Sequence, residues 1–200
     1  MREVTVATIR LLGGHPALDF ANTVDCRGAQ PGPDVLRSFD DLRRWALRCG
    51  VIDGAEADRL ALVPEGRGRQ ALLRATALRE ALFRVLKQFP AEGAPLPADL
   101  LLIRRELQAG ERARTLAASA EGYAWTWDAD DPDTITHRLA LAAADLMTTP
   151  ALARLRVCPG ENCGWLFLDN SRSGRRLWCS EESCGRRSRI RRWRAKQRDG

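Results

Sequence analysis

The feature that most constrains this chain is a regular set of cysteines near its C-terminus. Four of the six cysteines follow the spacing C-x4-C-x15-C-x4-C within CPGENCGWLFLDNSRSGRRLWCSEESC (158–184). Two close thiol pairs separated by a loop can supply four soft ligands to a tetrahedral zinc ion with little strain. Four protein ligands leave no position for water, so the site is expected to be structural. The sequence therefore predicts one structural Zn²⁺, bound by Cys158, Cys163, Cys179 and Cys184.

The alternatives for these cysteines are two disulfides or four unrelated buried thiols. No run of about 18 uncharged apolar residues is present, so no membrane span is expected. The N-terminal stretch MREVTVATIRLLGG has no long apolar core and no small-residue cleavage site. We therefore expect no secretory signal and a cytoplasmic, nucleoid-associated protein. Thiols stay reduced in that compartment, which favours a metal site over disulfides.

Positive charge is concentrated at the same end of the chain. The net charge is +6, but residues 151–200 carry 13 Arg and Lys against 5 Asp and Glu, whereas residues 1–150 carry 19 against 21. Arg accounts for 30 of the 32 basic residues, and a GC-rich genome explains that preference but not the clustering. A basic segment binds phosphates with release of counterions, so the clustering predicts a nucleic-acid partner, DNA foremost and RNA as an alternative.

Local patterns around the cysteines predict a turn, a hairpin and a helix. GWLFLDNS (164–171) and RRLWCS (175–180) have the composition of strands and are expected to pair across RSG. Ser180 is placed to cap a helix over 181–197, with Cys184 in its first turn. A thiol pair at each end of this arrangement predicts a treble-clef-like module.

The basic residues of this module are the candidates for contact with nucleic acid. Eleven basic and two acidic residues lie between 172 and 198. Ile190 and Trp193 are expected to pack back beside Trp165 or Trp178, which would hold the helix against the hairpin. The candidate nucleic-acid-binding residues are Arg172, Arg175, Arg176, Arg186, Arg187, Arg189, Arg191, Arg192, Arg194 and Lys196.

The first 150 residues carry a mostly helical pattern. Apolar periodicity, caps and glycine or proline stops predict helices at 14–28, 38–50, 54–63, 69–89, 97–107 and 131–147. Gly110 is expected to stop the fifth of these, and Asp131 to cap the last with Pro132 at its first position. RTLAAS and YAWTW should form one hairpin, whose aromatic face is more typical of a core than of a pocket.

These patterns divide the chain into two parts. Residues 1–150 are expected to form a mainly α domain with a small β-hairpin (α+β). Residues 151–200 are expected to form the treble-clef-like zinc finger, with its hairpin and basic helix.

Little in the first part indicates catalysis. It contains no Walker loop, no G-x-G-x-x-G, no H-E-x-x-H and no Ser-His-Asp spacing, so an enzyme is not expected. His15 and His137 are interpreted as surface or capping residues. The candidates for a small-molecule effector site are Asp19, Asn22, Arg27 and Trp125. The alternative, which we prefer, is that Asp19 and Asn22 tie loops to the backbone.

Two segments resemble known families. CGWLFLDNSRSGRRLWCSEESCGRR (163–187) is similar to the CGNR zinc finger, and HPALDFANTVDCR (15–27) is similar to the opening of the ABATE domain that accompanies it. The resemblance covers nearly the whole chain, and the C-terminal motif is the more specific. It implies a stress-induced bacterial transcription regulator in which the four cysteines bind zinc and the finger binds DNA. The signature Asn is Arg186 here, which could add a phosphate contact.

The resulting expectation is a zinc-dependent DNA-binding transcription regulator, whose N-terminal domain senses an effector or forms a homodimer. One alternative is a zinc-containing RNA-binding or ribosome-associated protein. Another is a small-molecule enzyme in residues 1–150 with a structural zinc module.

Overall fold

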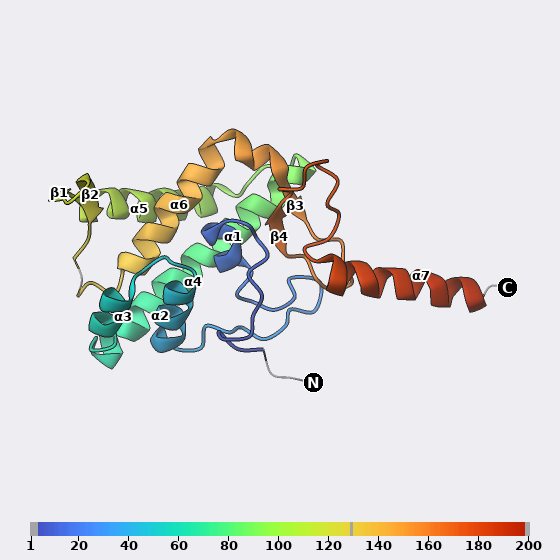
Figure 1. Cartoon of the computed structure of the whole chain (residues 1–200), viewed down its shortest axis with the longest axis horizontal. Coiled ribbons are helices and arrows are strands. Elements are labelled where there is room, and N and C mark those ends of the chain that lie inside the picture. The colour runs from blue at the N-terminus through green and yellow to red at the C-terminus, as the bar shows by residue number, and fades with distance from the viewer. Residues whose placement is uncertain (1–3, 129, 199–200) are drawn as a thin grey trace.

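A helical body carries one long helix that projects from it at the C-terminal end (Figure 1). The computed structural model describes residues 4–128 and 130–198. This part of the chain is mainly helical with two small antiparallel hairpins, so the predicted α+β class with a zinc finger is confirmed.

The short helix α1 (Pro16–Ala21) lies at the centre of the body and packs against α4, α6 and β4. His15 caps it by accepting a hydrogen bond from the Ala17 N–H at 3.3 Å, as a capping histidine should. Phe20 is fully buried. The predicted range of 14–28 is too long, because the chain leaves the helix after Ala21 to contact the zinc finger.

Two further helices, α2 (Phe39–Arg48) and α3 (Gly54–Leu60), begin where their sequence signals predict. In each, the first residue before the helix and the third residue inside it cap one another's backbone N–H groups. These reciprocal pairs are Ser38 with Asp41 and Asp53 with Glu56. Trp45 of α2 is fully buried, and its ring lies 5.4 Å from that of Phe20 between centroids.

The long helices α4 (Glu65–Gln88), α5 (Pro97–Ala113) and α6 (Thr134–Thr148) form the largest part of the body. The predicted stop at Gly110 is wrong. A methyl group at Gly110 would lie 3.1 Å from the carbonyl oxygen of His137, so this glycine allows α5 and α6 to pack closely instead of ending α5. His137 is consequently buried, not on the surface.

The predicted start of α6 is also three residues too early. Asp131 does not cap the helix, and Pro132 is outside it. Instead, the carboxylate of Asp131 accepts a hydrogen bond from the Asp133 N–H at 3.1 Å, and its carbonyl accepts one from the Thr134 N–H at 3.1 Å. These bonds close a turn that precedes the helix.

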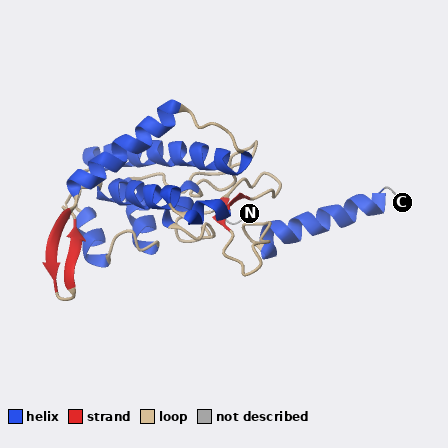
Figure 2. Ribbon diagram, turned by 90° about the horizontal axis from the view of Figure 1, so that it is seen from above, coloured by secondary structure: helices blue, strands red, loops and turns tan. Residues whose placement is uncertain are grey.

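Strands β1 (Thr115–Ser119) and β2 (Gly122–Thr126) form the predicted hairpin. It projects from the end of the body opposite the C-terminal helix (Figure 2). Tyr123 is 79% exposed and Trp125 is 52% exposed, so the expectation that this aromatic face is core is wrong. Two strands alone bury little, and the guanidinium of Arg114 is the group stacked on Trp125, at 4.0 Å.

The second hairpin pairs β3 (Leu155–Val157) with β4 (Leu166–Leu168). It therefore encloses the first cysteine pair instead of linking the two pairs. The predicted pairing of 164–171 with 175–180 is wrong, because 175–180 contains no strand.

Asp169 explains this difference. Its carboxylate accepts hydrogen bonds from the backbone N–H groups of Ser171 and Arg176, each at 3.0 Å. The segment between them is thereby folded into a loop, whose backbone groups are not free to pair with β4.

The remaining elements are short 3₁₀ turns η1 (Phe89–Ala91) and η2 (Pro150–Arg154), a π-helical turn η3 (Glu181–Gly185) and the basic helix α7 (Arg186–Arg198). Buried residues before and after position 150 belong to one contiguous core, which includes all four predicted zinc ligands. None of the described helices is long and apolar enough to cross a membrane.

Candidate metal centre and nucleic-acid interface

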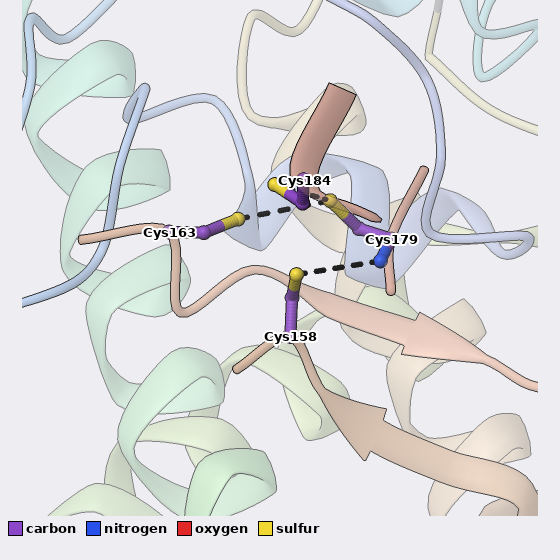
Figure 3. A group of neighbouring side chains, drawn as sticks. All are labelled: Cys158, Cys163, Cys179 and Cys184. Carbon is purple, nitrogen blue, oxygen red and sulfur yellow. Dashed lines mark hydrogen bonds between the residues drawn. The ribbon is translucent and has the colours of Figure 1, made fainter. Parts of the chain in front are cut away.

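The four predicted ligands converge on one buried point where the finger meets the body (Figure 3). Their Sγ atoms all lie within 4.8 Å of one another, and none of the four residues is more than 8% exposed. The Sγ atom of Cys179 is 3.7 Å from that of Cys163 and 3.7 Å from that of Cys184. The fourth ligand, Cys158, completes the group from the end of β3.

These distances fit a zinc ion. A tetrahedron with Zn–S bonds of about 2.3 Å places its sulfurs about 3.8 Å apart. Disulfide sulfurs are about 2.0 Å apart, and all six cysteines are free thiols here, so the disulfide alternative is wrong. The cluster is one structural zinc site with four thiolate ligands.

The first cysteine pair is held by a tight turn between β3 and β4. The Cys158 N–H donates to the Trp165 carbonyl at 2.8 Å, and the Cys163 N–H donates to the Gly160 carbonyl at 2.9 Å. A methyl group at Gly160 would lie 2.9 Å from the Sγ atom of Cys184. The turn therefore passes so close to the second pair that only glycine fits.

The second pair comes from the start of the basic helix. The Cys179 N–H donates to the Sγ atom of Cys158 at 3.4 Å. Ser180 caps η3 by accepting a hydrogen bond from the Ser183 N–H at 3.3 Å, as predicted, and Cys184 lies in that turn. Because η3 leads directly into α7, zinc binding at Cys184 fixes where α7 begins.

The thiols influence one another strongly. Hydrogen bonds from the thiols of Cys163, Cys179 and Cys184, and from the Cys179 N–H, lower the pKa of Cys158. Hydrogen bonding to the charged form favours that form. The cluster therefore favours a thiolate, and every ligand must lose its proton when zinc binds.

Arg176, one of the candidate nucleic-acid contacts, is used inside the finger. Its guanidinium lies 4.5 Å from the centroid of the Phe167 ring. It also donates to backbone carbonyl oxygens of Leu12, Leu168, Trp178 and Cys179. This arginine therefore holds the loop and the backbone of a zinc ligand together, and it brings positive charge toward the thiolates. The sequence places Arg176 among the arginines, with Arg156 and Arg175, that could offset the charge of the thiolates, but it does not predict these contacts.

The body contacts the finger through Asn22. Its side chain is 1% exposed and forms two hydrogen bonds with the backbone of Leu166 in β4, donating at 2.8 Å and accepting at 3.0 Å. Nearby, the indole N–H of Trp165 donates to the Val24 carbonyl at 3.0 Å. The chain after α1 therefore satisfies backbone groups on the free edge of β4.

The loop after α1 also contacts the turn that carries the first cysteine pair. The backbone N–H of Arg27 donates to the Cys163 carbonyl at 2.5 Å, and that of Gly28 donates to the Asn162 carbonyl at 3.2 Å. The side-chain oxygen of Asn162 accepts from the Gln30 N–H at 2.8 Å. A methyl group at Gly28 would lie 2.6 Å from the Asn162 Cα, so this contact requires glycine.

The structure does not bring the four effector candidates together. Trp125 lies on the exposed hairpin, far from the centrally placed α1 (Figure 1). Asn22 is used at β4, and the Asp19 carboxylate accepts a hydrogen bond from the Gly13 N–H at 2.8 Å. Burial raises the pKa of Asp19. The preferred alternative, that Asp19 and Asn22 tie loops to the backbone, describes their contacts.

Arg27 is also committed to internal contacts. Its guanidinium donates to the Glu80 carboxylate at 2.7 Å and to the Ala21 carbonyl at 2.6 Å. It lies 4.4 Å from the Phe83 ring centroid. The residue therefore joins the loop after α1 to α4.

The other candidate nucleic-acid contacts are exposed. Arg172 and Arg175 lie on the loop between β4 and η3, and the rest lie on α7, of which only Ser188 is buried. Two of them form ion pairs, Arg189 with Glu181 and Arg191 with Glu161, the latter at 3.0 Å. Among the described residues, no ion pair engages Arg172, Arg175, Arg186, Arg187, Arg192, Arg194 or Lys196.

The expected packing of α7 against the hairpin is wrong. Ile190 is 39% exposed and Trp193 is 62% exposed, and Trp165 is buried beneath the body's own chain. Both views show α7 extending away from the body (Figures 1 and 2). Zinc and the turn η3, not apolar packing along its length, anchor this helix.

A helical body continuous with a four-cysteine, treble-clef-like finger defines a zinc-finger protein. Residues 14–150 match the model of the ABATE family, whose description is "Putative stress-induced transcription regulator", and residues 154–197 match the CGNR zinc finger. The chain belongs to the ABATE family and carries a CGNR zinc finger, so the resemblance seen in the sequence is confirmed. A comparison with curated proteins gives no match.

Proposed function

We propose that this protein is a zinc-dependent DNA-binding transcription regulator that acts in the cytoplasm at the nucleoid, with α7 as its DNA-contacting element. The observation that carries the proposal is the exposure of α7. A helix of 13 residues projects from the body with basic residues along its length, anchored at its first turn by the zinc site. Its length of about 20 Å suits the major groove of duplex DNA.

The cations of α7 lie in positions that a duplex can contact. Arg187, Arg191, Arg194 and Arg198 recur at three- or four-residue spacing and share one face, where they line an open hollow with Trp193. The ion pair of Arg191 with Glu161 is solvent-exposed, so it contributes little and a phosphate can replace the carboxylate. Arg172 and Arg175 extend the basic surface beyond the helix.

Fluorescence anisotropy with a labelled mixed-sequence duplex tests this proposal. If six or more phosphates are contacted, affinity falls about a thousandfold or more between low and moderate salt. Arg194→Gln should weaken binding and reduce the salt slope by about one. Arg104→Gln, an exposed arginine of α5, is the matched control and should change neither. A flat salt profile, or equal effects of the two substitutions, contradicts the proposal.

The zinc requirement is tested separately with Cys179→Ser. Structural zinc contributes directly to folding free energy, so this variant should lose both zinc and duplex binding. Hydrogen exchange gives a second measurement: α7 amides should exchange fast in the free protein and become protected on duplex DNA, because an isolated helix shorter than about 12–15 residues is marginal. Normal zinc content and normal binding by Cys179→Ser would show that the ligand assignment is wrong.

An exposed tryptophan favours a second candidate function, binding of RNA or single strands. Trp193 stands among arginines, where an unpaired base can stack on it. Titration of duplex DNA and of structured RNA at equal salt separates the two functions. Trp193→Ala should weaken the single-stranded complex by about 1–3 kcal/mol while changing duplex affinity much less.

For the body we propose an effector-sensing or dimerising role. A hollow of about 350 Å³ lies between α2, α3 and α4, with apolar walls that include Phe39, Leu60 and Leu72 and with Arg43 and Arg69 at its side. Asp40 and Glu65 also line the hollow, and Asp40 pairs with Arg43 at 2.5 Å, so a small molecule with an apolar part matches this lining without a preferred charge. Neither histidine lines the hollow, which does not favour the alternative of an enzyme.

A further inference from the structure

The free edge of the hairpin β1–β2 has the properties of a strand that pairs with another chain. Its ten strand residues include no charged residue and no proline, although 29% of the whole chain is charged. Exposed strand edges are usually protected from pairing by charge, proline or bulges. This hairpin lacks those devices, and no backbone hydrogen bond joins β1 to any other described segment than β2.

One face of the hairpin is apolar and mostly exposed, although Arg114 stacks on Trp125. The register places Leu116 opposite Trp125 and Ala118 opposite Tyr123, so these four side chains share a face. Leu116 is 56% exposed, in addition to the exposed Tyr123 and Trp125. A two-stranded hairpin is marginal in water, whereas three or more strands with an apolar face are stable.

We propose that a second copy of this chain pairs with β1 around a two-fold axis at Ala117, forming a four-stranded antiparallel sheet. A two-residue turn joins Ser119 to Gly122. In such a hairpin the two residues that flank the turn form a pair whose backbone N–H and C=O groups bond to each other. Hydrogen-bonded and non-hydrogen-bonded pairs alternate along an antiparallel hairpin. Leu116 and Ala118 belong to the non-hydrogen-bonded pairs, so their backbone N–H and C=O groups point to the free edge of β1. In the proposed register Leu116 lies opposite Ala118 of the second copy, and the backbone N–H and C=O groups of these two residues form hydrogen bonds with each other.

Charge selects β1 and selects a second copy as its partner. Arg114, which also pairs with Glu111 at 2.5 Å, immediately precedes β1, and Glu121 lies in the turn that follows it. Antiparallel pairing at Ala117 places Arg114 of each copy beside Glu121 of the other, at two equivalent junctions. Pairing of β2 at Ala124 would instead place Glu121 beside Asp128 of the other copy, which is repulsive.

The consequence is an elongated dimer. The hairpin and α7 lie on opposite sides of the folded molecule (Figure 2). In the proposed dimer the two basic helices would therefore lie at the two far ends. This inference deepens the dimerising role proposed above for the body. It does not depend on DNA binding, because it is tested without nucleic acid.

Sedimentation equilibrium on the full-length, zinc-loaded protein tests the proposal over a wide concentration range. The wild type should dimerise reversibly. Ala118→Pro removes an outward N–H from each copy without touching the inner ladder, and it should remain a monomer with unchanged zinc content and circular dichroism. A monomeric wild type, or a proline variant that dimerises normally, overturns the proposal.

Charge exchange tests the register. Glu121→Arg should weaken the dimer about tenfold, since like charges then meet at both junctions. Arg114→Glu should weaken it as well, and an equimolar mixture of the two variants should associate at least as tightly as the wild type. Asp128→Arg is the matched control and should leave the dimer unchanged. Tighter association of Asp128→Arg, or no recovery in the mixture, overturns pairing through β1.

Discussion

Gly160 shows how closely the two halves of the zinc site approach one another. A methyl group there would lie 2.9 Å from the Sγ atom of Cys184 and 3.1 Å from the Cβ atom of Cys163. We predict that Gly160→Ala weakens zinc retention about tenfold or more against a chromophoric chelator, because two ligands must shift. Gly66→Ala is the control: nothing lies within 4 Å of its new methyl group, and alanine stabilises the first turn of α4. Equal zinc retention by both variants would contradict this account.

Asn22 gives a second prediction at the residue scale. Asn22→Ala leaves the buried N–H and C=O of Leu166 without partners. Each unsatisfied buried group costs about 1–3 kcal/mol, so the loss of two partners should lower the free energy of unfolding by about 2–6 kcal/mol in urea denaturation. Asn170→Ala, at an exposed asparagine after β4, should cost less than about 0.5 kcal/mol. Comparable losses for the two would show that the contact with β4 contributes little.

The sequence predicted the zinc ligands but not the long-range contacts that hold the site together. Cysteine spacing carries the chemistry of a tetrahedral thiolate site within 27 residues, so local reasoning suffices. Asn22 meets Leu166 across 144 positions, and Arg176 meets Leu12 across 164. No local pattern indicates which distant residue such a side chain will meet, so the partners of Asn22 and Arg176 could not be predicted from the sequence.

At the scale of elements, local signals predicted the helices but not all of their ends. Ser38 with Asp41 and Pro97 at a first helical position marked helix starts correctly, because their effect is local. Gly110 and Asp131 misled, because the first serves packing between helices and the second closes a turn. The burial of the hairpin was mispredicted for a similar reason. The alternation of residue types predicts the two strands but not which other segments pack against them.

The contact between α4 and α5 gives a pH-dependent prediction. Two hydrogen bonds from Arg84, at 2.8 and 2.6 Å, lower the pKa of Asp99 in the folded protein. A lowered pKa contributes stability that is complete above the pKa of the unfolded residue, about 3.9, and is lost as pH falls through the lowered value. Asp99→Asn should therefore be less stable than wild type in urea at pH 7, and the difference should shrink below about pH 4.

Asp58→Asn is the control for that series, since Asp58 is exposed and no ion pair engages it in the described chain. It should follow the wild type at every pH. A difference between wild type and Asp99→Asn that stays constant down to about pH 2 would show that the hydrogen-bonded ion pair does not depend on the charge of Asp99.

At the scale of the whole molecule, the finger and the body should unfold together. Their buried residues form one core, and the chain from Arg10 to Gln30 contacts the finger at several points. We predict a single calorimetric transition for the zinc-loaded protein, which moves to lower temperature as a whole when a chelator removes zinc. For a chain of this size each kcal/mol lost lowers Tm by about 2–4 °C. Two transitions, of which only one responds to the chelator, would contradict this.

The contact between the loop after α1 and the cysteine turn also constrains how such proteins can evolve. A finger exchanged between two relatives would arrive without the amide that meets its β4 edge and without the glycine that admits its Asn162. The matching residues of the body would stay behind in the donor. If α7 contacts DNA as proposed, a new specificity is therefore easier to reach by altering the free surface of α7 than by exchanging whole fingers, because the exposed residues of α7 can vary without disturbing that contact.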